Sequence, residues 1–241
     1  MTDAVVRAGR RYLPRGWSDL GRQLLIWFGF LLVYQLVRGF ADRSPAQAFH
    51  NGLRVISFET NVNALYELTF QRLAQQSQWL SAAVSWTYWN SEFTVVGLAL
   101  LWVYVRRHDY FYRFRNWILL ANVFGLVGYI FMPTAPPRMF PSFGFIDSHR
   151  DGVVQLAANP YAAMPSLHAA DALIVGITLA VICKRPLFKL FWALWPVWVW
   201  FSVMATGNHF WLDVLAGNLV AILAGVVIYR KPLRRRILAR A

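Results

Sequence analysis

The sequence predicts an all-α, polytopic membrane protein with six transmembrane helices and interfacial helices in the first outer loop. Of its 241 residues, 58% are hydrophobic and 17% aromatic, and the mean hydropathy is +0.40. An average soluble domain is only about 45–50% apolar. Apolar runs long enough to cross a bilayer, about 17–25 residues, recur at roughly 24–40, 79–105, 117–133, 165–183, 187–206 and 210–229.

The basic residues divide unevenly between the two sides that six alternating crossings create. The chain carries 24 Lys and Arg against 11 Asp and Glu, a net charge of +13, and 18 of the 24 fall on the side that holds both termini. This bias is the positive-inside pattern, which predicts cytoplasmic termini. The charge therefore indicates topology and contact with anionic lipid headgroups, and nucleic acid is not an expected partner.

We expect one membrane-embedded domain over residues 1–241. Its basic ends, 1–22 and 230–241, are predicted to be cytoplasmic. Segment 41–78 places apolar residues at helical spacing between charged residues and Gln, which favours amphipathic helices in the outer interface. Segment 133–165 is rich in Pro and bracketed by polar motifs. Because loops of that length are often functional, we interpret it as an active-site loop.

Two features of the last two runs concern helix packing. Small residues recur every fourth position at Gly217, Ala221 and Gly225, which predicts a close approach to neighbouring helices. Pro196 falls inside the fifth run and predicts a kink, because its ring removes a backbone donor that neighbouring groups must replace.

Two short motifs carry most of the candidate chemistry. In Ala205-Thr-Gly-Asn-His-Phe-Trp-Leu-Asp213, His209 and Asp213 stand four residues apart, on one face if the segment is helical. A carboxylate so placed can accept a ring N–H, fix the tautomer and free the other nitrogen as a nucleophile. In Ala163-Met-Pro-Ser-Leu-His168, His168 heads the fourth run. Six crossings bring both motifs, and Arg138 after the third run, to the outer face.

This combination suits phosphoryl transfer, in which catalysis is mostly positioning and charge stabilisation. Arg138 can grip phosphate oxygens with its fork, the helix start after Pro165 offers backbone N–H groups to the same anion, and Ser166 adds a hydroxyl. His209 would form a phosphohistidine while His168 protonates the leaving oxygen. No cluster has metal-ligand spacing, so neither a metal nor a cofactor is expected.

Each of these residues, taken singly, also has a structural explanation. A histidine at a helix end often caps it, Pro-Ser is an ordinary helix start, and a lone arginine often snorkels. Their coincidence at one face favours catalysis. A transporter or flippase that binds lipid phosphate is the alternative of another class, but transporter sites lie near the midplane and these residues stand at helix ends.

Two of these stretches resemble known signatures. Pro165-Ser-Leu-His168 and Ser202-Val-Met-Ala-Thr-Gly-Asn-His-Phe-Trp-Leu-Asp213 are similar to the second and third signatures of the type 2 phosphatidic acid phosphatase superfamily, Pro-Ser-Gly-His and Ser-Arg-x5-His-x3-Asp. Leu167 in place of Gly, and the Pro-Thr-Ala-Pro-Pro-Arg box, make the chain more similar to the inositolphosphorylceramide synthase and sphingomyelin synthase branch and its bacterial relatives.

The resemblance covers about residues 40–228 and implies a six-span fold. It also implies a role for each matched residue: His209 as nucleophile, Asp213 as its partner, His168 as acid and base, and Arg138 with Ser166 as phosphate ligands.

The chain departs from the superfamily at two cationic positions. Phe131 stands where the first signature, Lys-x6-Arg-Pro, has its lysine, and Val203 stands where the third has its arginine. Arg150 in the outer loop is a candidate replacement charge. Fewer cations suit a phosphodiester, with one negative charge, better than a monoester dianion, which favours headgroup transfer.

Four more residues are candidates for the pocket. Glu92 and Asp171 are acids inside apolar runs, where burial is costly and function is the default interpretation; for Asp171 a structural role is equally favoured. Asn208 belongs to the motif that ends at Asp213, and Tyr161 lies two residues before the motif that begins at Ala163.

We therefore expect an integral membrane lipid phosphotransferase or phosphatase that acts through a phosphohistidine at the extracytoplasmic face. Its substrate would be a membrane phospholipid or polyprenyl phosphate, and the transfer would resemble that of an inositolphosphotransferase. The alternative within enzymes is a simple lipid or polyprenyl phosphate phosphatase.

Overall fold

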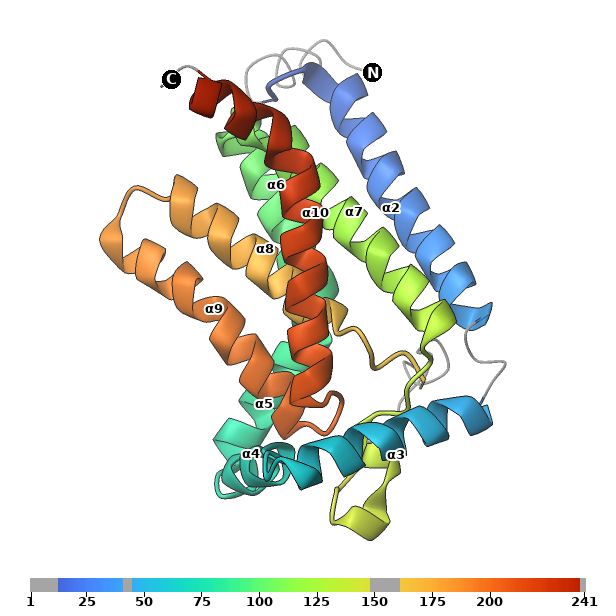
Figure 1. The fold of residues 1–241 in the computed structure, drawn as a ribbon. Coiled ribbons are helices and arrows are strands. Elements are labelled where there is room, and N and C mark those ends of the chain that lie inside the picture. Colours follow the sequence, from blue (N-terminus) through green and yellow to red (C-terminus); the bar gives the residue numbers. More distant parts are fainter. Residues whose placement is uncertain (1–12, 41–44, 148–160, 239–241) are drawn as a thin grey trace.

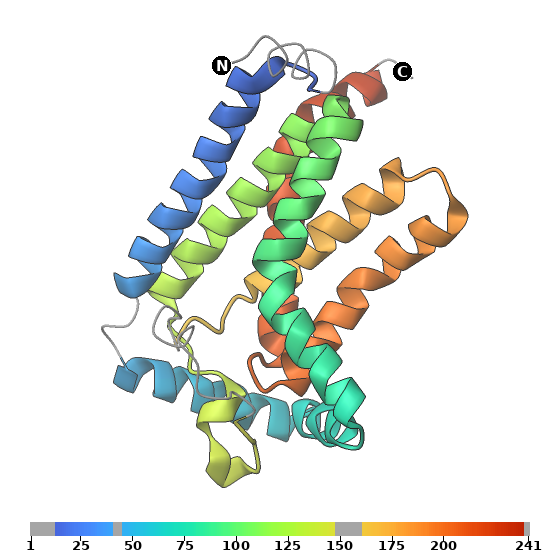
Figure 2. The same ribbon diagram turned by 180° about the vertical axis from the view of Figure 1, so that it is seen from behind.

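The computed structural model describes residues 13–40, 45–147 and 161–238, and the regular elements among them are helices. In chain order these elements are α2 (Gly16–Phe40), α3 (Pro45–Asn61), α4 (Glu67–Gln75), α5 (Gln78–Asn90), η2 (Ser91–Val95), α6 (Val96–Arg106), α7 (His108–Phe131), η3 (Pro137–Met139), η4 (Pro141–Phe143), α8 (Leu167–Ile182), α9 (Pro186–Ala205) and α10 (Trp211–Leu238). The starts of α2 and α7 and the end of α10 gather at one end of the bundle, and α3 and α4 lie at the other (Figures 1 and 2).

The all-helical class is confirmed, and the predicted apolar runs coincide with helices. Among the described residues, α7, α9 and residues 211–230 of α10 are long and apolar enough to cross a membrane. The first run lies in α2, the second in the continuous rod α5–η2–α6, and the fourth in α8, which is apolar but has 16 residues. The protein is thus a helical membrane protein, and six crossings stay a prediction.

Segment 41–78 forms helices where it is described, and α3 runs crosswise over one end of the bundle (Figure 1). Its inner face contributes Ala48, Val55 and Ile56 to a small apolar cluster with Phe140 and Phe210. This cluster covers the end of the bundle at which the two histidine motifs lie, and it includes Met164 and Phe210 from those motifs. Whether α3 and α4 lie in a membrane interface stays a prediction.

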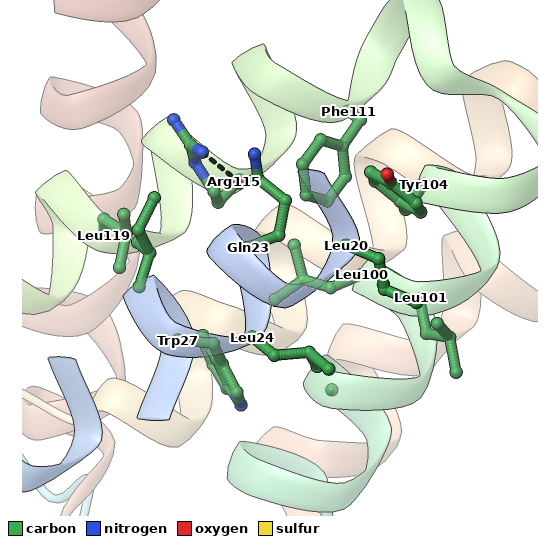
Figure 3. A pocket seen from close by; sticks show the side chains of 12 residues that line it. Leu20, Gln23, Leu24, Trp27, Leu100, Leu101, Tyr104, Phe111, Arg115 and Leu119 are labelled. Atoms are coloured by element: carbon green, nitrogen blue, oxygen red, sulfur yellow. Dashed lines mark hydrogen bonds between the residues drawn. The ribbon is translucent and has the colours of Figure 1, made fainter. Parts of the chain in front are cut away.

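A polar network joins α2 to α6 and α7 near the opposite end. Asp19 accepts hydrogen bonds from Tyr104 of α6 (2.9 Å) and from Arg22 (2.7 Å). Arg115 of α7 donates to Gln23 of α2, beside an apolar cavity of about 60 Å³ (Figure 3). These bonds attach α2 to the bundle where its apolar outer face alone would not specify a register.

The small residues of α10 make the close approaches that their spacing predicts. A Cβ placed on Gly217 would lie 2.0 Å from the backbone oxygen of Ser166, at the start of α8. The carbonyl of Ala221 accepts the indole N–H of Trp117 of α7 (2.7 Å), and a Cβ on Gly225 would lie 2.9 Å from the same ring. One stripe of α10 therefore packs against both α7 and α8.

The α8–α9 hairpin is packed in the same manner. A Cβ on Gly176 of α8 would lie 2.7 Å from the ring of Pro196 in α9. Pro196 lies inside the helix, as predicted, and its ring occupies the space that a side chain at position 176 would take. The kink at Pro196 stays a prediction.

We expect Gly217→Ala to lower the free energy of unfolding by about 1–3 kcal/mol, the usual cost of overpacking, because the new methyl group meets backbone rather than a flexible side chain. Thermal unfolding in detergent measures the effect. Gly97→Ala is the matched control, since nothing lies within 4 Å of a Cβ at that helical position. Equal stability of the two variants would contradict the contact.

Candidate active site

Backbone hydrogen bonds tie the three predicted motifs together at one end of the bundle. The N–H of Arg138 donates to the carbonyl of Gly207 (2.9 Å), and the N–H of Ser166 donates to the carbonyl of Asp213 (2.9 Å). The two ends of loop 133–165 pair with each other, since Thr134 N–H donates to the carbonyl of Tyr161 (2.8 Å). The predicted convergence is therefore real.

The turn between α9 and α10 holds His209. Gly207 has a φ of +69°, in the left-handed region that favours glycine, and this reverses the chain after α9. The N–H groups of Asn208 and His209 then both donate to the carbonyl of Val203 (3.1 and 3.2 Å). His209 thus lies in the turn before α10 and not on the helical face that its spacing from Asp213 suggested.

The ring of His209 is held through one nitrogen. Its Nδ1 lies 2.9 Å from the carbonyl of Ala163 and 3.5 Å from Oδ2 of Asp213, and that Oδ2 also accepts the N–H of Phe210 (2.8 Å). The shorter contact is the one to Ala163, which the sequence did not point to. Two acceptors at Nδ1 favour the tautomer with its proton there, which leaves Nε2 as the unprotonated nitrogen.

The ring of His168 pairs with an acid from another helix. Its Nε2 lies 3.3 Å from Oε2 of Glu92, in the π-helical turn η2, and Tyr34 of α2 donates to Oε1 of the same carboxylate (3.2 Å). The ring of Tyr88 stacks on the imidazole of His168, with 4.6 Å between their centroids. The ring centroids of His168 and His209 are 5.6 Å apart. Glu92 is therefore part of the histidine cluster, and π-helical turns often mark such sites.

Asp171 lies one turn further into α8 and is 2% exposed. Asn122 of α7 donates to its Oδ1 (2.9 Å). Because a buried polar group needs a partner, this bond gives Asp171 a structural function in joining α7 to α8.

Arg138 lies beside the turn that carries His209. Its Nη1 donates to Oδ1 of Asn208 (2.6 Å), whose amide donates in turn to Thr206 (2.8 Å), and its Nε lies 3.9 Å from Asp147. The Arg138 side chain is 15% exposed. Asn208 thus orients the guanidinium, and the remaining N–H groups stay available for an anion.

The start of α8 is capped and closely packed. Ser166 is fully buried and its Oγ accepts the N–H of Ala169 (3.3 Å), which makes it the helix N-cap. The leucine that replaces the signature glycine, Leu167, is 1% exposed and fits against Gly125 of α7, where a Cβ would lie 2.4 Å from its side chain. The cap occupies the hydroxyl oxygen, and the Ser166 hydroxyl proton remains a donor.

Two further candidates are Tyr161 and Arg150. Tyr161 packs against Phe49 of α3 (6.1 Å between centroids), and Arg150 lies outside the described residues. At the two departures from the signatures, Phe131 is 79% exposed at the end of α7 and Val203 is fully buried. Within the described segments, no three His, Cys, Asp or Glu side chains are grouped as a metal site would require.

The sequence analysis missed two acids that hold the start of α10. Glu59 of α3 accepts the N–H of Leu212 (3.3 Å), and Glu67 of α4 accepts the N–H of Trp211 (2.6 Å). Both carboxyl groups are fully buried. With Asp213 capping Phe210, the N–H groups at the start of α10 are satisfied by side chains, as helix starts require. Glutamates in an amphipathic segment gave no sign of this long-range contact.

Burial raises the pKa of Glu59 and of Glu67 above the ordinary value of 4.5, and the nearby Asp213 carboxylate raises each pKa further. The N–H groups that they accept act in the opposite direction. Because the folded state holds these protons more tightly than the unfolded chain, their stabilising effect is fully present below the ordinary pKa. It is lost as the pH rises through the raised values.

We therefore expect the free energy of unfolding to decline between about pH 5 and pH 9, and Glu59→Gln to make this decline shallower. The amide keeps an oxygen for the Leu212 N–H but cannot ionise. Glu59→Ala is the matched control: it cannot ionise either but also removes the acceptor, so its stability should run parallel to that of Glu59→Gln and lie about 1–3 kcal/mol below it at every pH. Unfolding in detergent across this range measures both, and an unchanged slope in Glu59→Gln would contradict the assignment.

The chain is similar to known proteins in sequence and in fold. The phosphoinositol dihydroceramide synthase of Bacteroides thetaiotaomicron is 29% identical over a stretch that covers 46% of this chain and 43% of the relative. This chain therefore matches less than half of that relative's length. The crystal structure of Aquifex aeolicus LpxE has the same fold, with a TM-score of 0.52 at 18% identity, over 68% of this chain and 94% of LpxE.

The family model described as the PAP2 superfamily matches residues 53–227. This segment includes the paired Glu92 and His168, the arginine Arg138, and both His209 and Asp213. Because the match spans most of the chain, the protein belongs to the PAP2 superfamily, whose members are phosphatases and phosphotransferases.

Proposed function

We propose that this protein transfers the phosphoryl part of a membrane lipid through a phosphohistidine on His209. The observation that carries the proposal is the contact of its Nδ1 with Ala163 and Asp213, which favours the proton on Nδ1 and the lone pair on Nε2. A second histidine, His168, lies 5.6 Å away and is paired with an acid. A nucleophile oriented by one partner beside a separate acid–base group is the arrangement that covalent catalysis requires.

In the first step, Nε2 of His209 attacks phosphorus as the bond from phosphorus to the lipid oxygen breaks. Charge grows on the phosphoryl oxygens and on the leaving oxygen. Arg138, held by Asn208, stabilises the former with its free N–H groups. Protonated His168, whose charge the Glu92 carboxylate stabilises, gives a proton to the leaving oxygen.

In the second step, a hydroxyl oxygen attacks the phosphohistidine and the phosphorus–nitrogen bond breaks. His168, now neutral, takes the hydroxyl proton, which restores its pairing with Glu92 as an imidazolium. Asp213 offsets the positive charge that His209 acquires during each transfer. The acceptor is an alcohol in a transferase and water in a phosphatase.

We favour a phosphodiester donor and an alcohol acceptor. Val203 and Phe131 stand where the signatures have two cations, and Val203 is fully buried near the end of α9. Less positive charge suits the single negative charge of a diester. The relative named as a phosphoinositol dihydroceramide synthase supports headgroup transfer, and inositol phospholipids are the first donors to test. Hydrolysis of a lipid or polyprenyl monoester is the second candidate.

A transporter that only binds lipid phosphate is less favoured. The histidine rings lie where α8 begins and α9 ends, rather than at the middle of broken helices. The 18-to-6 division of basic residues supports cytoplasmic termini and an extracytoplasmic site.

Purified protein incubated with phosphatidylinositol and with polyprenyl phosphates, followed by mass spectrometry of the products, tests the reaction. We expect His209→Ala to abolish turnover and the acid-labile phosphoenzyme that rapid quench traps from the wild type. A phosphoenzyme that survives in His209→Ala would refute the nucleophile.

The roles of His168 and His209 can be distinguished by comparing substrates whose leaving groups differ in their need for a proton. An aryl phosphodiester such as p-nitrophenyl phosphorylcholine needs no proton on its leaving oxygen, whereas an alkyl lipid does. His168→Ala should therefore lose about 100- to 10000-fold on the lipid and far less on the aryl ester, and His209→Ala should be inactive on both. Glu92→Gln should follow the pattern of His168→Ala. Equal losses on the two substrates would refute proton donation by His168.

Topology has its own test. In a background with Cys183→Ser, a cysteine at the exposed position Ser142 should react with an impermeant maleimide on intact cells, and one at the exposed position Tyr110 should not. Permeabilised cells, in which both should react, provide the control. The opposite labelling pattern would place the site on the cytoplasmic face.

A further inference from the structure

A large groove lies between α6, α8 and α9, towards the end of the bundle opposite the histidines. Its volume is about 980 Å³, against about 60 Å³ for the cavity beside α2. Its walls are mostly apolar and include Leu98, Trp102, Leu179, Ile182, Phe188 and Trp192. Figure 2 shows the connected ends of α8 and α9 (orange) leaning away from α6 (green).

The rim of this groove is basic. Arg106 and Arg107 line it from the end of α6, and Lys184 and Arg185 line it from the α8–α9 connection. Arg107 donates to the carbonyl of Ile182 (2.8 Å) and so closes the end of α8. The other three side chains are exposed and make no ion pair with any residue that the structure describes.

The chemistry of the groove is that of an amphipathic anion. Its volume is at the upper end of the range for small-molecule sites, about 300–1,000 Å³. Aromatic and aliphatic walls match acyl chains, whereas three cations that pair with no acid among the described residues match a phosphate at one mouth. Basic pockets between transmembrane helices on the cytoplasmic side are known to take anionic headgroups. An uncharged lipid would leave these cations without a counter-charge.

We propose that the groove binds an anionic glycerophospholipid of the leaflet opposite the active site. Its acyl chains would lie between α6 and the α8–α9 hairpin, and its phosphate would contact Arg106, Lys184 and Arg185. The N-cap Arg185 makes no side-chain cap bond at the start of α9, and the positive end of this helix dipole lies at the same mouth. This site is separate from the histidine cluster and does not depend on the reaction assigned to it.

The single cysteine provides a probe, because Cys183 lines the groove and is the one cysteine of the chain. The full-length protein in detergent is labelled there with a nitrobenzoxadiazole fluorophore. It is then titrated with phosphatidylglycerol or phosphatidylcholine that carry the same nitroxide-labelled acyl chains. We expect half-maximal quenching at a mole fraction of phosphatidylglycerol on the order of tenfold lower than of phosphatidylcholine.

Two matched triple variants assign the preference. Arg106→Gln, Lys184→Gln and Arg185→Gln together should bring the two quenching curves together. Arg113→Gln, Lys189→Gln and Arg230→Gln remove three exposed cations at the same end that do not line the groove, and should keep the preference.

A further variant tests the apolar part. Ala99 lines the groove and is 5% exposed. A phenylalanine ring at this position should fill part of the groove, so Ala99→Phe should weaken quenching by both lipids. Native mass spectrometry of the unlabelled protein should show phosphatidylglycerol bound to the wild type and to the control triple, and lost from the groove triple. Equal quenching of the wild type by the two lipids, or an equal loss of preference in both triples, would overturn the proposal.

Discussion

The contact between the start of α8 and the first turns of α10 is the constraint on which the rest of the site depends. Ser166 donates its backbone N–H to the carbonyl of Asp213, and Gly217 one turn later lets the two backbones approach without a Cβ between them. His168 projects from one of these helices and His209 precedes the other. This backbone contact brings the two rings together, and their centroids lie 5.6 Å apart.

The start of α10 is supported by side chains from several elements. Helix starts leave N–H groups without intrahelical partners, and here three carboxyl groups that are fully buried accept them. Asp213, Glu59 and Glu67 do so from three different elements. The carboxylate that faces His209 is thus also a structural cap. The position of Asp213 beside His209 therefore depends on the way in which α3 and α4 close the end of the bundle.

The departures from the superfamily signatures form a consistent set. Leu167 would not fit where the signature has glycine unless α7 offered Gly125 opposite it, and it does. The backbone carbonyl of Val203, at the arginine position, accepts the N–H groups of Asn208 and His209, and Asn208 orients Arg138. Of the signature cations, the described residues thus keep Arg138, in keeping with the proposed substrate of lower charge.

The sequence by itself determined the helical class, the convergence of the three motifs and the candidate histidines. Those inferences rest on hydrophobic run length and on the order of helix ends, which alternate between two faces whatever the packing. Only the tertiary structure decided which groups touch the reactive rings. The Ala163 carbonyl contacts His209 from the loop before α8, and Glu92, which Tyr34 of α2 supports, contacts His168. Glu59 and Glu67 hold the start of α10 from α3 and α4. Such contacts depend on how the helices rotate against one another, and no local spacing encodes that rotation.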